Sequence, residues 1–162
     1  MDSRAAELID RLRLEPHPEG GFYRRVFRST LDVLPGDGRG QRAALTTIYY
    51  LLTRDTFSRW HQVMSNEAWH LYEGAPVDLL ELDAACTELN RYHLATIGEA
   101  EGEPLHVVAA GQWQAARSLG AYSLLGCSVG PGFDFADFRL MADDDIASAA
   151  VLERWSDVAD LI

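Results

Sequence analysis

The pattern of hydrophobic and polar positions predicts a chain built mainly from short β-strands. Apolar, β-branched and aromatic runs alternate with glycine-rich or acidic turns at roughly even spacing. The runs cover residues 21–29, 44–53, 60–64, 67–72, 77–83, 92–97, 105–109, 112–118, 122–128 and 138–141. Many short strands separated by turn signals are typical of a β-sandwich or a closed β-barrel.

Helical patterns flank this β-rich region on both sides. Residues 3–14 carry apolar side chains at helical spacing, and the prolines that follow end the pattern. Three consecutive aspartates introduce a second helix at about 144–156, since acidic side chains are favourable near the positive end of a helix. No internal repeat or low-complexity linker divides the chain. We therefore expect a single domain over residues 1–162, with a β-barrel at about 20–141.

The charge of the chain limits its partners. It has 162 residues, a formal net charge of −11, and no lysine among its 14 basic residues. Nucleic-acid binding needs clustered cations. The small basic cluster of Arg24, Arg25 and Arg28 is better explained as a solvated strand face than as a phosphate site. No apolar run reaches the ~18 residues of a membrane span. We expect neither nucleic acid nor a membrane as a partner.

The N-terminal segment and the cysteines indicate the compartment. Residues 1–14 are charged throughout and lack the apolar centre of a signal peptide. Cys86 and Cys127 lie far apart and form no CxxC pair, which favours reduced structural thiols. The expected location is the cytoplasm.

The candidate chemistry lies in residues 60–74, where two imidazoles and a carboxylate fall on two short strands. Alternate residues of a strand face the same side. If the inward faces line a barrel, His61 and Glu67 point into it together, and Trp69 shares the face of Glu67. A buried carboxylate needs a partner, so the two can form an acid–base pair or two metal ligands. His70 has the opposite parity and faces outward unless a bulge intervenes.

This segment resembles the first motif of the cupin superfamily, in which a His-x-His pair is followed by a glutamate and then a glycine. His61 takes the first histidine position, Val63 the second, Glu67 the glutamate, and Gly74 the glycine after six intervening residues. Residues 107–114 resemble the second cupin motif, with Gln114 where the histidine would stand.

Four phrases make the resemblance more specific. Residues 17–23, 65–74, 111–115 and 126–133 resemble, in order, the recurrent phrases of the uncharacterised cupin family DUF985, or cupin_5. The resemblance runs from about residue 8 to 141. It implies an all-β double-stranded β-helix, the cupin jelly roll, with short N- and C-terminal helices. It also implies assembly as a homodimer, and it implies no settled reaction.

The departures from the cupin pattern bear on cofactors. A typical metal cupin offers three imidazoles and one carboxylate, whereas Val63 and Gln114 replace two of the imidazoles here. A divalent metal such as Mn, Fe, Ni or Zn would have to bind through His61, Glu67 and Gln114. Such a site would bind a metal more weakly than the typical cupin site of three imidazoles and one carboxylate, because a neutral amide oxygen is a poor ligand for transition metals.

Three functions remain open. The first is an enzyme that isomerises or epimerises a small polar metabolite, sugar- or carboxylate-like, in the barrel pocket. Related jelly-roll epimerases use a histidine base and a tyrosine acid, so His61 would be the base and Glu67 its partner. Tyr23, Tyr49 or Tyr72 would be the acid. The second is a divalent-metal-dependent cupin enzyme, and the third is a non-catalytic module that binds a small molecule.

Several aromatic and polar side chains are candidates for the pocket wall. We assign ligand binding to Gln114, Trp69, Tyr49 and His70, although core packing is the common role of such aromatic residues. Tyr23 belongs to the phrase at 17–23, which either completes a sheet, crosses to a partner subunit, or reaches the pocket mouth.

Overall fold

The computed structural model describes residues 1–98 and 102–162, and it confirms an all-β jelly roll with short terminal helices. The strands are β1 (Glu15–Pro16), β2 (Phe22–Arg28), β3 (Asp32–Val33), β4 (Arg42–Ala43), β5 (Thr46–Thr53), β6 (Phe57–Val63), β7 (Asn66–Gly74), β8 (Val77–Leu82), β9 (Leu89–Leu94), β10 (Leu105–Val108), β11 (Trp113–Ser118), β12 (Tyr122–Gly130) and β13 (Phe138–Leu140). The helices are α1 (Ser3–Leu12) and α2 (Asp145–Arg154), with 3-10 helices η1 (Phe135–Asp137), η2 (Met141–Asp143) and η3 (Ser156–Leu161).

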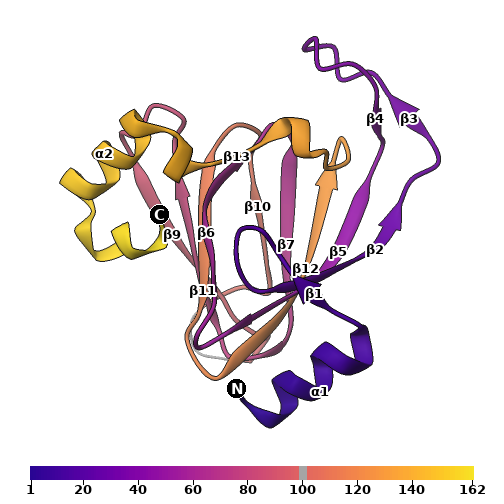
Figure 1. Cartoon of the computed structure of the whole chain (residues 1–162), viewed down its shortest axis with the longest axis vertical. Helices are drawn as coiled ribbons and strands as arrows, with labels where there is room; N and C mark the ends of the chain where they lie inside the picture. Colours follow the sequence, from indigo (N-terminus) through magenta and orange to yellow (C-terminus); the bar gives the residue numbers. More distant parts are fainter. Residues whose placement is uncertain (99–101) are drawn as a thin grey trace.

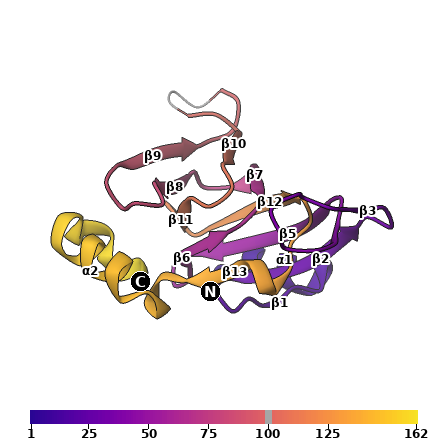
Figure 2. The same cartoon turned by 90° about the horizontal axis from the view of Figure 1, so that it is seen from above.

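Two antiparallel sheets face each other and form the barrel. One has the strand order β1-β2-β5-β12-β7-β10 and the other β13-β6-β11-β8-β9. Seen from above, β8, β9 and β11 lie across from β2, β5 and β12 (Figure 2). The short β3–β4 pair forms a separate arm that extends beyond the barrel beside β2 and β5 (Figure 1).

The terminal helices cover different sheets. Asp2 caps α1 by accepting hydrogen bonds from two backbone N–H groups. Ala5 and Leu8 of α1 pack with Leu51 and Leu124 of the six-stranded sheet. At the other end of the chain, α2 and η3 pack on the five-stranded sheet, and Trp60 Nε1 donates to the Val158 carbonyl. Both helices therefore stabilise the barrel from outside and leave its interior free.

The interior is only partly filled by hydrocarbon. A buried cluster that includes Tyr50, Leu52, Trp69, Leu79 and Leu125 occupies one part of the space between the sheets. Burial of such side chains provides most of the stability of a domain of this kind. The remaining part is a cavity, and it holds the candidate site.

The turn between β6 and β7 determines which side chains meet in that cavity. It consists of Met64 and Ser65, and it carries the chain from the five-stranded to the six-stranded sheet. His61 on β6 and Glu67 on β7 therefore face each other across the barrel, as strand alternation predicts. In the part of the chain that the structure describes, no helix has the length and apolarity needed to cross a membrane.

Candidate functional site

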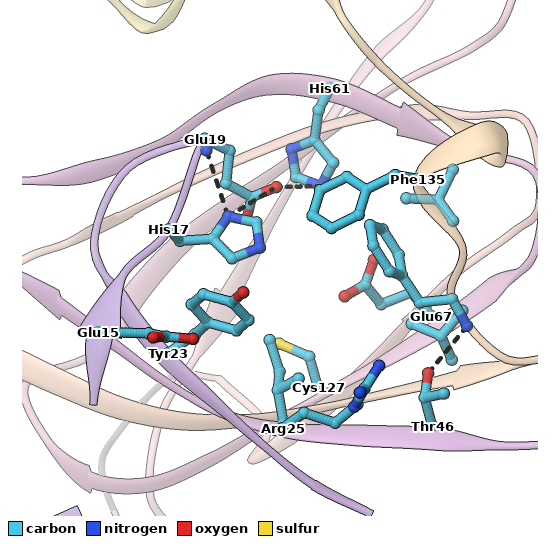
Figure 3. Close-up of a pocket in the computed structure, with 14 residues that line it drawn as sticks. Glu15, His17, Glu19, Tyr23, Arg25, Thr46, His61, Glu67, Cys127 and Phe135 are labelled. Carbon is cyan, nitrogen blue, oxygen red and sulfur yellow. Dashed lines mark hydrogen bonds and ion pairs between the residues drawn. The ribbon is translucent and has the colours of Figure 1, made fainter. Parts of the chain in front are cut away.

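The candidate site is a cavity of about 310 Å³ inside the barrel. Its titratable lining includes His17, Glu19, His61 and Glu67, and aromatic side chains such as Phe135 form part of its wall (Figure 3). Pockets for small ligands commonly combine an apolar wall with a few convergent polar groups. The cavity has this composition, and its size suits a small metabolite.

His61 presents an unprotonated nitrogen to the cavity. Its Nδ1 lies 2.7 Å from the Arg59 carbonyl oxygen. Because a carbonyl can only accept, Nδ1 carries the proton and Nε2 keeps its lone pair. Nε2 lies 3.3 Å from Glu19 Oε2. Burial lowers the pKa of His61, so the neutral form is favoured and Nε2 is available as a base.

Glu67 is a buried carboxyl group that is oriented by a hydrogen bond from Gln114. Gln114 Nε2 donates to Glu67 Oε2 over 2.6 Å, and Trp69 Nε1 donates to Gln114 Oε1 over 2.9 Å. Burial raises the pKa of Glu67 to about 7, against the opposing effect of the neighbouring His61. A carboxyl with this pKa both accepts and releases protons near neutral pH, as a general acid or base must.

Glu19 is a cavity residue that strand alternation did not identify. Only 6% of its surface is exposed, and its carboxyl lies between His17 and His61. Ser58 Oγ donates to Glu19 Oε1 over 2.9 Å. Burial raises the pKa of Glu19, so the acid and the neighbouring imidazoles are stable together as neutral groups.

The turn at residues 17–21 brings Glu19 into the cavity. Its backbone is fastened to the neighbouring strand, since Arg59 N–H donates to the Glu19 carbonyl over 2.9 Å. Gly20 has φ of +113°, and a Cβ at this position would lie 2.0 Å from the Phe57 carbonyl oxygen. Only glycine fits this close approach. The phrase at 17–23 was therefore the signal for this part of the site, although periodicity could not show which side chain turns inward.

His17 and Tyr23 complete this side of the cavity. Glu19 N–H donates to His17 Nδ1 over 3.2 Å, and burial lowers the pKa of His17. The rings of His17 and Tyr23 meet edge to face with centroids 4.4 Å apart. Tyr23, predicted as a catalytic acid, does line the cavity.

The other predicted ligand-binding residues lie elsewhere. Trp69 is fully buried in the core, and Gln114 stands behind Glu67 rather than on the cavity surface. Tyr49 lines a separate hollow beside α1 together with Tyr72. His70 stacks on Tyr72 with centroids 6.4 Å apart, outside the cavity.

Cys127 also lines the cavity, whereas Cys86 lies in the core beneath α2. Both are free and buried. Burial, followed by the nearby carboxyl of Glu67, raises the pKa of Cys127 well above its ordinary value. Cys127 is therefore a neutral thiol in the wall and not a nucleophilic thiolate.

Solved structures share this fold. A hypothetical protein from Leishmania major is 29% identical, with the match covering 98% of this chain and 96% of that chain at a TM-score of 0.83. A protein from Shewanella oneidensis is 29% identical, covering 97% and 93% at a TM-score of 0.80. A cupin 2 conserved barrel domain protein from Rhodopseudomonas palustris is 15% identical, covering 91% and 84% at 0.54, and shows a likeness of fold alone. No curated protein matches this chain.

A family model described as Cupin superfamily (DUF985) matches residues 6–141. The chain belongs to this cupin family. The resemblance carried by the four sequence phrases is thereby confirmed, and the matched range contains each cavity residue named above.

The side chains at this cupin's metal-motif positions do not fit a metal ion. Val63, at the second histidine position, lines the cavity with hydrocarbon. The Gln114 amide oxygen accepts the Trp69 indole N–H and its NH2 group faces Glu67, so Gln114 presents a donor and not an oxygen toward the site, and it does not line the cavity. Among the described residues, no group of three His, Cys, Asp or Glu side chains is arranged to hold a metal. The predicted set of His61, Glu67 and Gln114 lacks its third donor, and we assign no step to a metal ion.

Proposed function

We propose that this cupin transfers protons to and from carbon in a small polar metabolite, as an isomerase or epimerase without redox chemistry. The observation that carries the proposal is that His61 and Glu67 are both buried and face one cavity, and that among the described residues Glu67 forms no ion pair with an arginine. Burial of such groups is unfavourable, and buried titratable groups with shifted pKa values are typical of sites of acid–base catalysis.

The two groups suit opposite halves of a proton transfer. In the forward step, a C–H bond beside a carbonyl breaks and His61 Nε2 takes the proton. The C–H electron pair forms a C=C bond, and the carbonyl π pair moves to oxygen. Glu67, with a pKa of about 7, then returns a proton to carbon from another side. Glu67, once it has given up its proton, is the carboxylate that favours the imidazolium, and Glu19 Oε2, 3.3 Å from His61 Nε2, can accept a hydrogen bond from the new N–H.

The charge at the cavity supports an anionic metabolite. Arg25 on β2 lines the cavity and is exposed, and no carboxylate among the described residues pairs with it. Glu15, also exposed, lines the same opening. Burial raises the pKa of both Glu19 and Glu67, which reduces the negative charge inside the cavity, and Arg25 is the group that can hold a carboxylate on the ligand.

Deuterium exchange tests the proposal without knowledge of the product. Small hydroxy- and keto-carboxylates and sugar acids are incubated with the protein in D2O, and loss of C–H signals is followed by proton NMR. His61→Gln and Glu67→Gln should each slow exchange about 100-fold or more. His70→Gln is the matched control, because His70 lies outside the cavity.

Other outcomes point elsewhere. A panel compound that raises the melting temperature but never exchanges would replace the proposal with a non-catalytic binding module. Tyr23→Phe separates the acid roles, since loss of exchange in this variant alone would return the predicted acid role to Tyr23.

A further inference from the structure

We propose that His17 donates a hydrogen bond to the oxyanion that develops on the substrate during the reaction. The substrate is therefore a carbonyl compound with an acidic C–H beside the carbonyl group. This inference rests on the proposed function and adds to it a second histidine with a distinct role. The juxtaposition behind it is that His17 and His61 line one cavity, and that backbone hydrogen bonds at Nδ1 fix the two rings in opposite tautomers.

The backbone sets the two rings in opposite tautomers. At His61, Nδ1 meets the carbonyl of Arg59, an acceptor, and must carry the proton. At His17, Nδ1 accepts from the backbone N–H of Glu19, a donor, and must be unprotonated. A neutral imidazole has one proton, so that of His17 is on Nε2. His61 thus offers a lone pair at Nε2, and His17 offers an N–H at the same position.

The free N–H of His17 is directed at the place where charge develops. The ring nitrogen away from Glu19 points into the hollow, on the side where Tyr23 also enters (Figure 3). Among the described residues no acceptor bonds to this nitrogen, although only 8% of the side chain surface is exposed. Because His17 lines the cavity and this nitrogen opens onto it, an oxygen of the ligand can accept its hydrogen bond.

A neutral imidazole is suited to this task. When the carbonyl π pair moves to oxygen, the oxyanion accepts a hydrogen bond from Nε2–H without removing the proton. Preorganised donors in a site that excludes water are among the largest contributions to catalysis, and neutral histidine is known in such a role. Burial lowers the pKa of His17, which keeps the ring neutral and its tautomer fixed.

Two substitutions separate the donor from the structural role of His17. Asparagine at position 17 keeps an oxygen near Nδ1 that can accept Glu19 N–H, because asparagine bonds the backbone two residues on. The asparagine side chain is too short to place a hydrogen-bond donor where His17 Nε2 lies. Glutamine reaches that depth with an NH2 group but does not reproduce the short turn contact. A structural role therefore predicts that His17→Asn is the milder change, and a donor role predicts that His17→Gln is.

The test uses acetate as an oxyanion probe with the full chain. Long-range 1H–15N NMR at neutral pH should show the Nε2–H tautomer for His17 and the Nδ1–H tautomer for His61. Added acetate should shift His17 Nε2. In His17→Asn its affinity should fall about tenfold or more, as expected for loss of one hydrogen bond to a charged group. His17→Gln should retain most of the affinity, and His93→Asn, an exposed residue of β9, should retain all of it.

The outcomes are distinct from those of the exchange experiment. An Nδ1–H or doubly protonated His17, no acetate binding, or full affinity in His17→Asn would each overturn the donor role even if exchange is observed. Acetate binding that depends on His17, in a protein that exchanges no panel compound, would keep the donor and remove the proton-transfer function.

Discussion

Glu67 and Gln114 are joined by a hydrogen bond of 2.6 Å whose direction is fixed by a third side chain. An indole N–H can only donate, so Trp69 requires Gln114 to present its oxygen to the ring and its NH2 group to Glu67. These two hydrogen bonds, from Trp69 to Gln114 and from Gln114 to Glu67, form a relay in which Glu67 Oε2 is always the acceptor. A proton taken up by Glu67 is therefore expected on Oε1, which does not accept the hydrogen bond from Gln114.

Removal of the relay should affect both stability and titration. In Gln114→Leu, the indole N–H of Trp69 is buried without an acceptor and Glu67 loses its donor. We expect the free energy of unfolding to fall by about 1–3 kcal/mol. The pKa of Glu67 should rise above about 7, because the hydrogen bond from Gln114 lowers it. Denaturant unfolding and 13C NMR of the carboxyl measure these effects.

Gln112→Leu is the control for this prediction. Gln112 precedes β11, and its Oε1 has no partner among the described residues. Leucine at position 112 should leave the pKa of Glu67 unchanged and should not lower the free energy of unfolding, since it removes an acceptor that has no partner among the described residues. An unchanged carboxyl titration in Gln114→Leu would show that Gln114 only fills space.

The raised pKa of Glu67 predicts a pH-dependent gain of stability in Glu67→Gln. In the unfolded chain the carboxyl ionises at its ordinary value of 4.5, whereas in the folded protein it does so at about 7. Between these values the folded state binds more protons, so its stability falls as pH rises. The advantage of Glu67→Gln over wild type should be small below pH 4.5 and reach about 3 kcal/mol above pH 7.

Urea unfolding at several pH values measures this difference. Glu15→Gln is the control, since Glu15 is exposed at the opening of the same cavity. A constant difference between Glu67→Gln and wild type from pH 4 to 8 would contradict a buried, protonated Glu67.

Strand periodicity predicted most of the barrel because its signal is local. The run at 44–53 became β5 (Thr46–Thr53), and the run at 122–128 became β12 (Tyr122–Gly130). Alternation also placed His61 and Glu67 on inward faces, since a one-residue error in parity would have turned them outward. Boundaries shifted by up to three residues beside turns, since the run at 92–97 became β9 (Leu89–Leu94).

The remaining residues of the site could not be predicted from strand periodicity. Glu19 and His17 lie in a turn whose shape depends on Gly20 and on contacts with β6, which is distant in sequence. Tyr49 illustrates the opposite case. It stands in a strand that is apolar on both faces, so composition could not tell the cavity from the outer surface.

Asp137 connects the β3–β4 arm to the wall of the cavity. It belongs to η1, beside Phe135, and 4% of its side chain is exposed. Arg42 donates to both its oxygens over 2.7 and 2.8 Å, and Arg39 donates over 3.0 Å. Arg39 also donates to Ser65 in the turn between β6 and β7. These hydrogen bonds lower the pKa of Asp137.

Loss of the Asp137 charge should lower the stability of the protein, because the β3–β4 arm is then held less firmly to η1. Asp137→Asn leaves Arg42 without its carboxylate and Arg39 paired with Asp37 alone, and we expect the free energy of unfolding to fall by about 1–3 kcal/mol. The loss of stability should shrink as the pH falls below 3.8, the ordinary pKa of an aspartate, and vanish only where wild-type Asp137 is protonated in the folded protein as well. Asp134→Asn is the matched control, because Asp134 is exposed and asparagine can replace it as the cap of η1. Equal stability of the two variants would contradict a structural role for the cluster.

The donor set predicts how this cupin responds to metals. Wild-type protein produced without an affinity tag should contain far less than one equivalent of Mn, Fe, Ni or Zn, and EDTA should leave deuterium exchange unchanged. Val63→His combined with Gln114→His restores imidazoles at the two departed motif positions, and this variant should take up about one equivalent of Zn. Elemental analysis and melting curves with and without Zn measure both effects. One equivalent of metal in wild type that disappears in His61→Gln would contradict the metal-free proton transfer, because His61 Nε2 would then be a ligand and not the base.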